Sequence, residues 1–185
     1  MALLNVIPEM IFNGDCILRN TVLEDAEPIS RIWRELGDDP EMICGRRITQ
    51  ADVCRFVNEG DLPGMLGARA ELYRMKTVSN MDGEVLGFFD VYHGYPSREV
   101  LWINTLMIDR RYWGMGLSRM VLDSLREEAI RAGYTRLGTS VPVLNWPRIR
   151  FFLNEGFSQA LGLTGDAYWG PGKMAQLCLG QNLEL

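Results

Sequence analysis

The sequence predicts a mixed α/β (α+β) domain with about seven strands and about four helices. A chain of 185 residues, 47% of them apolar, is long enough to form one domain with a sizeable core. Its apolar residues recur at helical spacing in the first third and at strand spacing from about residue 68 to residue 105; helix and strand patterns then alternate. We therefore expect one domain over residues 1–185, with a strand–helix–strand unit at its centre.

The N-terminal half predicts a hairpin, two helices and three strands. Apolar runs at residues 4–12 and 15–19 flank Asn13-Gly14, the strongest short hairpin signal, so residues 1–20 are expected to form a β-hairpin. The expected helices cover residues 23–36, which end at Gly37, and residues 50–58, which follow Thr49. The expected strands cover residues 72–78, 85–92 and 100–108.

The C-terminal half predicts two helices and three strands. A helix over residues 117–132 is expected to end at Gly133, and a strand follows over residues 137–141. Asn145 is suited to cap a short helix over residues 146–155. The last two expected strands cover residues 157–163 and 174–180, with the loop Gly165–Gly172 between them.

The amino-acid composition argues against several classes of partner, cofactor and location. The 24 acidic residues outnumber the 19 basic ones, and the basic residues form no block, so nucleic acid is not an expected partner. No apolar run is long enough to span a membrane, and the N-terminus does not resemble a signal peptide. The four cysteines form no C-x-x-C pair and are typical of reduced thiols, which together predicts a cytoplasmic location. A single histidine, His93, argues against a histidine-based metal site, and we expect no metal.

The most informative segment is the turn that follows the apolar strand over residues 100–108. Gly114 and Gly116 stand between this strand and the helix that begins near Leu117. Such a turn brings unpaired backbone N–H groups and a helix N-terminus to one place, which suits a phosphate or pyrophosphate. Two glycines can also serve only to turn the chain tightly. A P-loop is excluded because its lysine is missing, and a dinucleotide fingerprint is excluded because Arg119 occupies the place of its third small residue.

At this turn the chain resembles the GNAT N-acetyltransferase superfamily. The family's acyl-CoA motif reads roughly V-x-P-x-x-[QR]-G-x-G-x-[GA], and residues 108–118 read IDRRYWGMGLS, with Trp113 and Ser118 as departures; a second register places Arg111 at the [QR] position. A later family motif, N-x-x-A-x-x-[FL]-Y-x-x-x-G-F, is similar to residues 145–157, which read NWPRIRFFLNEGF. The clear resemblance covers about residues 84–160.

The resemblance implies a central twisted, mostly antiparallel sheet and acetyl-CoA as co-substrate. It implies that the loop over residues 113–118 holds the pyrophosphate, that a backbone N–H near Leu106–Ile108 polarises the thioester oxygen, and that Asn145 contacts the pantetheine arm or the adenylate side. Where this chain has Phe152, the family often has a tyrosine that acts as the general acid toward the departing CoA thiolate. The residues expected at the CoA site are therefore Leu106, Met107, Ile108, Trp113, Gly114, Met115, Gly116, Leu117, Ser118, Asn145 and Phe152.

Candidate catalytic residues follow from the chemistry that the resemblance implies, which is attack of an amine on the thioester. The amine must lose a proton, and Asp90, Glu99 and Asn104 are the candidates, with His93 more typical of a structural residue. Tyr92 or Tyr168 is available as the acid in place of Phe152. Tyr168 and Trp169 are also candidates for an aromatic wall of the acceptor pocket.

The leading hypothesis is an N-acetyltransferase that acts by direct attack of a small-molecule or peptide amine. The alternative is a non-catalytic acyl-CoA-binding or regulatory module on the same fold, which is motivated by Phe152. A third hypothesis is a member that modifies a polypeptide chain. Because this fold often dimerises, a homodimer is also expected as one state of the protein.

Overall fold

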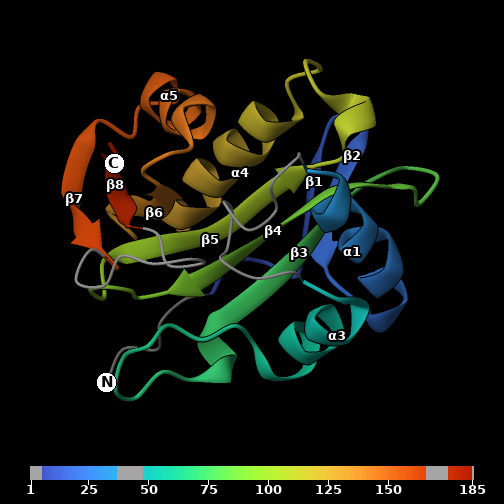
Figure 1. Ribbon diagram of the computed structural model, residues 1–185, viewed down its shortest axis with the longest axis horizontal. Helices are drawn as coiled ribbons and strands as arrows, with labels where there is room; N and C mark the ends of the chain where they lie inside the picture. The colour runs from blue at the N-terminus through green and yellow to red at the C-terminus, as the bar shows by residue number, and fades with distance from the viewer. Residues whose placement is uncertain (1–5, 37–47, 166–174, 185) are drawn as a thin grey trace.

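Eight strands form one sheet in the order β1-β2-β3-β4-β5-β6-β8-β7 (Figure 1). The computed structural model describes residues 6–36, 48–165 and 175–184. Neighbouring strands are antiparallel except β5 and β6, which are parallel. The mixed α/β class is confirmed, and the sheet has eight strands, close to the expected number of about seven. The strands are β1 (Met10–Asn13), β2 (Cys16–Asn20), β3 (Tyr73–Asn80), β4 (Val85–His93), β5 (Val100–Ile108), β6 (Arg136–Pro142), β7 (Gln159–Thr164) and β8 (Gln176–Asn182).

Four α-helices in the described ranges cover the two faces of this sheet. They are α1 (Ala26–Glu35), α3 (Gln50–Glu59), α4 (Leu117–Arg131) and α5 (Trp146–Asn154). Figure 1 shows α4 and α5 on one face and α1 and α3 on the other. The first expected helix begins with a 3₁₀ turn, η1 (Leu23–Asp25), before α1. No helix in residues 6–36, 48–165 and 175–184 has the length and apolar character that a membrane span needs.

Local chemistry explains where the two short helices begin. Thr49 accepts a hydrogen bond from the Asp52 backbone N–H, and the Asp52 carboxylate accepts one from the Thr49 backbone N–H, so the two form a capping box at α3. At α5 the predicted cap is confirmed, because Asn145 Oδ1 accepts a hydrogen bond from the Arg148 N–H at 3.2 Å.

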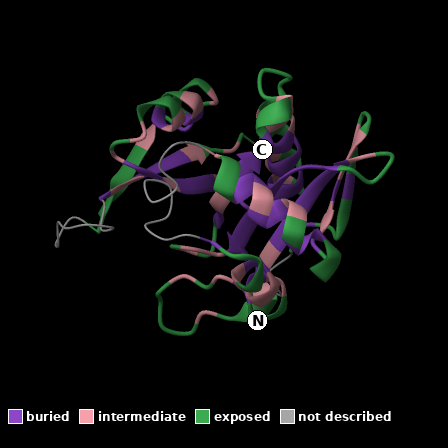
Figure 2. Cartoon of the chain, turned by 45° about the vertical axis from the view of Figure 1, so that its right-hand side comes forward, coloured by how far each residue is buried: buried purple, intermediate pink, exposed green. Residues whose placement is uncertain are grey.

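Two hydrophobic cores lie on opposite faces of the sheet, and Figure 2 shows the buried strands between partly exposed helices. The first core joins α4 and α5 to one face through residues such as Val121, Leu125 and Phe152. The second joins α1 and α3 to the other face through residues such as Ile29, Trp33 and Phe56. Because side chains alternate along a strand, each central strand contributes to both cores.

At the N-terminus, Met10–Asn13 and Cys16–Asn20 pair as a hairpin whose first strand is shorter than expected. Gly14 turns the chain at φ +57°, and β1 begins at Met10, so residues 6–9 of the expected strand lie outside it. The residues just before β1 are held differently, since the Ile7 N–H donates to His93 Nε2 at 3.1 Å and Lys76 Nζ donates to the Pro8 carbonyl. Side chains from the sheet therefore hold residues 7 and 8, and the Asn20 backbone N–H of β2 donates to the Glu9 carbonyl at 2.9 Å.

Candidate functional site

The sheet opens between the two parallel strands β5 and β6. They pair only at their beginnings, where Val100–Ile103 lie beside residues 136–139. Beyond this point β5 continues its ladder with β4, and β6 continues its ladder with β8. The Thr139 hydroxyl donates to the Ile103 carbonyl at 2.9 Å at the last pair. The later backbone of both strands, residues 104–108 and 140–142, therefore borders an opening instead of a ladder.

A cavity of about 290 Å³ lies at this opening. Its walls come from both faces of the sheet and from the opening itself. The lining residues are Trp33, Ile48, Asp61, Asn104, Thr105, Met107, Ser140, Pro142, Arg148 and Gln176.

A β-bulge in β5 brings two consecutive side chains into this cavity. Asp90 of β4 pairs with Thr105 and Val91 pairs with Ile103, so Asn104 is an extra residue without a partner in β4. Consecutive residues of a regular strand point to opposite faces, and a bulge interrupts that alternation. Asn104 and Thr105 therefore both line the cavity.

Asp90 is buried directly behind Asn104. The Asn104 amide donates to Asp90 Oδ2 at 3.1 Å, while Asp90 Oδ1 has no hydrogen-bond partner among the described residues. Burial, with a smaller contribution from the charge of Asp61, raises the pKa of Asp90 to about 6, although hydrogen bonds from Asn104, Thr105 and Tyr73 act in the opposite direction. A carboxyl with this pKa is mainly ionised at neutral pH and accepts a proton readily.

Tyr73 of β3 lies beside Asp90 on the same face of the sheet. Burial, and after it the charge of Asp90, raise the pKa of the Tyr73 phenol well above its usual value. The Tyr73 hydroxyl is buried, and its hydrogen-bonding interaction with Asp90 adds to this shift. A buried carboxyl beside a buried phenol, with Asp90 Oδ1 left without a well-aligned partner among the described residues, is unusual in a core and marks this place as a site.

The glycine turn after β5 has the geometry that an anion needs. Gly114 and Gly116 adopt φ of +78° and +79°, and an added Cβ at either one meets no atom within 4 Å. Gly116 is the N-cap of α4, whose first turn contains no acidic residue. The first N–H groups of a helix have no partner inside the helix, so those of α4 are available to an anionic group beside this open turn.

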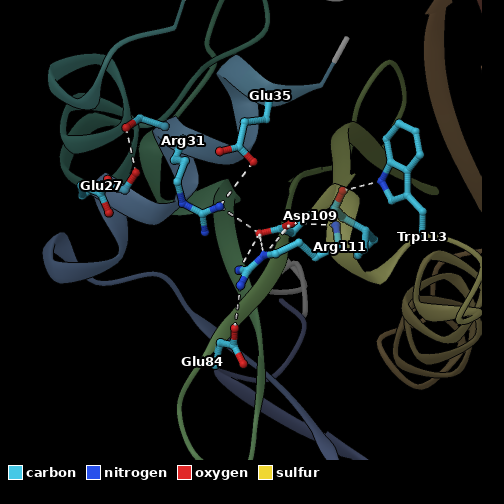
Figure 3. A network of polar contacts seen from close by, with 9 residues as sticks. Glu27, Arg31, Glu35, Glu84, Asp109, Arg111 and Trp113 are labelled. Atoms are coloured by element: carbon cyan, nitrogen blue, oxygen red, sulfur yellow. Dashed lines mark hydrogen bonds and ion pairs between the residues drawn. The ribbon is translucent and has the colours of Figure 1, made fainter.

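A network of charged side chains fixes the start of this turn (Figure 3). Asp109, fully buried, accepts hydrogen bonds from the Arg111 backbone at 2.9 Å and from the Arg111 side chain at 2.8 Å. Arg31 of α1 reaches the same carboxylate at 3.2 Å. Although burial alone raises the pKa of Asp109, these hydrogen bonds lower it below its usual value. Trp113 Nε1 also donates to the Ile108 carbonyl at 2.8 Å, which ties the turn back to the end of β5.

The structure brings only part of the predicted CoA site to exposed positions. Trp113 and Met115 are exposed, and Leu117 and Ser118 are half-buried at the start of α4. Met107 lines the cavity, whereas the side chains of Leu106 and Ile108 are buried in β5. Phe152 is 1% exposed and packs against Phe157, with ring centroids 5.0 Å apart, so its side chain belongs to the core.

Three candidates for proton transfer lie away from the cavity. Glu99 is exposed before the first residue of β5 and accepts a hydrogen bond from Ser97 at 2.7 Å. His93 is fully buried on the other face and is hydrogen-bonded to Ile7 and Leu72. The Tyr92 hydroxyl accepts from the Arg69 N–H at 2.8 Å. Tyr168 and Trp169 lie outside the described residues.

Two charged residues of the cavity, Asp61 and Arg148, are absent from the sequence prediction. Asp61 stands in a loop whose glycines and prolines alone do not indicate a site. Arg148 occupies the position of a small residue in the N-x-x-A motif, and this departure was the available signal. Among the described residues, no group of three or more His, Cys, Asp or Glu side chains has the arrangement of a metal site.

Comparisons with known proteins identify the family and the fold. The family model described as "Acetyltransferase (GNAT) family" matches residues 58–157, which is more than half of the chain. No curated protein matches the sequence.

Solved structures share the fold at low sequence identity. An acetyltransferase from Thermus thermophilus is 23% identical with a TM-score of 0.67, over 91% of this chain and 97% of that one. The ribosomal-protein-S18-alanine N-acetyltransferase from Escherichia coli is 14% identical with a TM-score of 0.64, over 92% and 95%. A spermidine N-acetyltransferase chimera from Vibrio cholerae and hSSAT is 12% identical with a TM-score of 0.67, over 92% and 96%.

Proposed function

Because the chain belongs to the acetyltransferase (GNAT) family, we propose that it transfers an acetyl group from acetyl-CoA to the amine of a small molecule or peptide. The observation that carries the proposal is the position of the glycine turn. It follows β5 directly at the end where β5 separates from β6, and it lies open at Gly114 and Gly116. A phosphate held there would place the rest of an extended ligand along the opening between the strands.

The residues of the turn fit the pyrophosphate of CoA. The positive φ of Gly114 and Gly116 and the empty space beside them allow an anion to approach the backbone closely. Residues 113–118 would bind the pyrophosphate, and the backbone of Leu106–Ile108, which pairs with β4 but has no strand partner on the side of β6, would supply an N–H to the thioester oxygen. Asn145 has its Oδ1 occupied by capping, so it would contact CoA through its amide NH₂ group. CoA itself supplies the activated acetyl group as a thioester.

Direct attack requires that the amine lose a proton. The amine lone pair forms a bond to the carbonyl carbon, the carbon–sulfur bond breaks, and its electron pair leaves with the sulfur. We assign the proton to Asp90, whose pKa of about 6 and unpartnered Oδ1 suit a general base. Because Asp90 lies behind Asn104, the proton reaches it through solvent in the cavity, and it then returns to the thiolate sulfur. Asn104 positions Asp90, and Glu99 has no part in this step.

The proposal requires that the protein bind acetyl-CoA, and a binding measurement tests this requirement. Isothermal titration should show saturable binding, and Gly116→Asp should weaken it at least tenfold, because the new carboxylate meets the pyrophosphate and the backbone is strained. Gly133→Asp is the matched control, since Gly133 also has a positive φ (+90°) and open space but follows the opposite end of α4. Equal loss in both variants, or no binding by the wild-type protein, would contradict the assignment.

The second candidate function is a non-catalytic acyl-CoA-binding module, and the burial of Phe152 where the family often has a tyrosine favours it. Thiol release from acetyl-CoA over a panel of amines separates the two functions. Saturable release with any one amine supports the enzyme, and tight binding without release over the panel supports the module. The homodimer and the cytoplasmic location stay predictions.

A further inference from the structure

One cation of the cavity has no role in the proposed reaction. Arg148 stands in the first turn of α5, which packs on the face of the sheet that carries α4. Its side chain nevertheless lines the cavity together with Trp33 and Met107, which belong to the core on the other face. Arg148 therefore extends through the opening between β5 and β6.

The Arg148 guanidinium has no anionic partner in the part of the chain that the structure describes. Its one recorded contact there is the ring of Phe152, whose centroid lies 5.7 Å from Cζ. By contrast, Arg19, Arg111 and Arg126 all form ion pairs with carboxylates. Burial lowers the pKa of Arg148 to about 10, which leaves it charged at neutral pH, and Asp90 opposes that shift without forming an ion pair. A half-buried cation without a partner is costly, so an anionic ligand would relieve it.

The cavity is small and is lined by side chains of both charges. Asp61 lines the same cavity as Arg148, and Asp90 lies one hydrogen bond behind its wall. A volume of about 290 Å³ lies at the lower limit for ligand pockets, and the acetyl end of CoA would enter the same opening, so only a compact acceptor fits beside it. A compact molecule with an amine and a carboxylate would match both charges.

We propose that the acceptor is a small amine that also carries a carboxylate, as a free amino acid does, and that Arg148 binds this carboxylate. This inference rests on the proposed acetyltransferase function. The planar guanidinium suits the two oxygens of a carboxylate, which it binds with two parallel hydrogen bonds. The amine is then directed to the side of Asp61 and Asp90, and the acetyl group is transferred to it in the step already described. The carboxylate takes no part in bond making and serves only to hold and orient the acceptor.

Matched pairs of acceptors test this inference. Thiol release from acetyl-CoA is measured with each standard amino acid and with its carboxamide, which keeps the amine and removes the negative charge. We expect at least one amino acid to be acetylated with a kcat/KM about 10²-fold above that of its amide, which is the usual penalty for leaving a buried charge unpaired. The amide has the more easily deprotonated amine, so chemical reactivity alone would give the opposite order.

Variants of Arg148 assign the preference to this side chain. Arg148→Met should lower kcat/KM for the amino acid about 10²- to 10³-fold and leave its amide nearly unchanged. Arg150→Met is the control, because Arg150 lies on the same helix with an exposed side chain. As a readout other than turnover, the preferred amino acid should raise the melting temperature of the CoA-bound wild-type protein but not that of Arg148→Met.

Three outcomes would overturn the inference while leaving acetyl-CoA binding intact. They are equal use of acid and amide, an equal loss for both in Arg148→Met, and no thiol release with any amino acid. Weaker acetyl-CoA binding by Arg148→Met would likewise assign Arg148 to the CoA site. Failure of the wild-type protein to bind acetyl-CoA is a different result, because it would contradict the proposed function itself.

Discussion

Asp90 and His93 stand three residues apart on β4 and are both buried, yet they differ in how their polar atoms are satisfied. His93 Nε2 accepts from the Ile7 N–H at 3.1 Å, and its Nδ1 lies 2.7 Å from the Leu72 carbonyl, so both ring nitrogens have partners. Asp90 has one oxygen bound by Asn104, and its other oxygen has no partner in the described ranges. Their pKa shifts follow burial in both cases, since each group moves toward its neutral form.

This difference separates a structural group from a candidate catalytic one. His93 holds the segment before β1 against β4, and any proton that it gained would break the bond to Ile7. Asp90 lies one hydrogen bond behind Asn104, which lines the cavity, and its Oδ1 has no well-aligned partner among the described residues. Burial and a shifted pKa alone therefore do not mark a catalytic group, whereas burial with an unused hydrogen-bonding atom beside a cavity does.

The largest expected effect is on activity in Asp90→Asn. Removing the base should lower kcat about 10²- to 10⁴-fold. In the wild-type protein kcat should fall as the pH decreases through about 6, because protonated Asp90 cannot accept the amine proton. In a profile of kcat against pH, this decrease on the acidic side forms the acidic limb, and the variant should lack it.

Glu99→Gln is the control for this prediction, because it makes the same carboxylate-to-amide change outside the cavity. It should retain wild-type kcat and the acidic limb near pH 6. If Asp90→Asn keeps more than a tenth of wild-type kcat, the proton goes elsewhere, and Asp61 becomes the next residue to replace.

The second effect is on stability in His93→Leu, which leaves the Ile7 N–H and the Leu72 carbonyl unpaired. We expect a loss of about 2–4 kcal/mol in the free energy of unfolding at pH 7.5, measured with urea. Relative to His93→Leu, the wild-type protein should also lose stability as the pH falls from 6.5 toward 4, because the pKa of His93 is lowered to about 4 and the unfolded chain binds the proton more tightly. The variant should lack that part of the pH dependence, and a variant as stable as the wild type would remove the contrast with Asp90.

The sequence predicted the fold more completely than it predicted the candidate site. Local signals placed the glycine turn after β5 and the Asn145 cap, since turn chemistry and caps depend on neighbouring residues. The bulge at Asn104 depends on the register between β4 and β5, and the opening at Ile103 depends on where two distant strands separate. Asp61 and Arg148 meet in one cavity only through that packing, so composition and periodicity could not predict their proximity.

A third effect is a gain of stability in Asp90→Asn, opposite in sign to the loss in His93→Leu. The pKa of Asp90 is about 6 in the folded protein and near 3.9 in an unfolded chain, so the folded state binds this proton more tightly. The wild-type protein therefore carries a penalty that is fully present above pH 6 and disappears as the pH falls toward 4. We expect the variant to be about 1–2 kcal/mol more stable at pH 7.5 and equal to the wild type near pH 4, as measured by urea unfolding. A loss of stability at pH 7.5 would show that the ionised carboxylate is satisfied in solution.

The smallest expected effect is a shift of the acidic limb in Asn104→Ala. The Asn104 amide stabilises the ionised carboxylate through its 3.1 Å hydrogen bond, so its removal should raise the pKa of Asp90. The midpoint of the profile of kcat against pH should move upward by about half a unit to one unit, which corresponds to one hydrogen bond to a charged group. Thr105→Val is the matched comparison, because Thr105 also lowers this pKa but less than Asn104 does. An unmoved midpoint in both variants would mean that the limb reports a group other than Asp90, and it would remove the distinction between the two buried groups of β4.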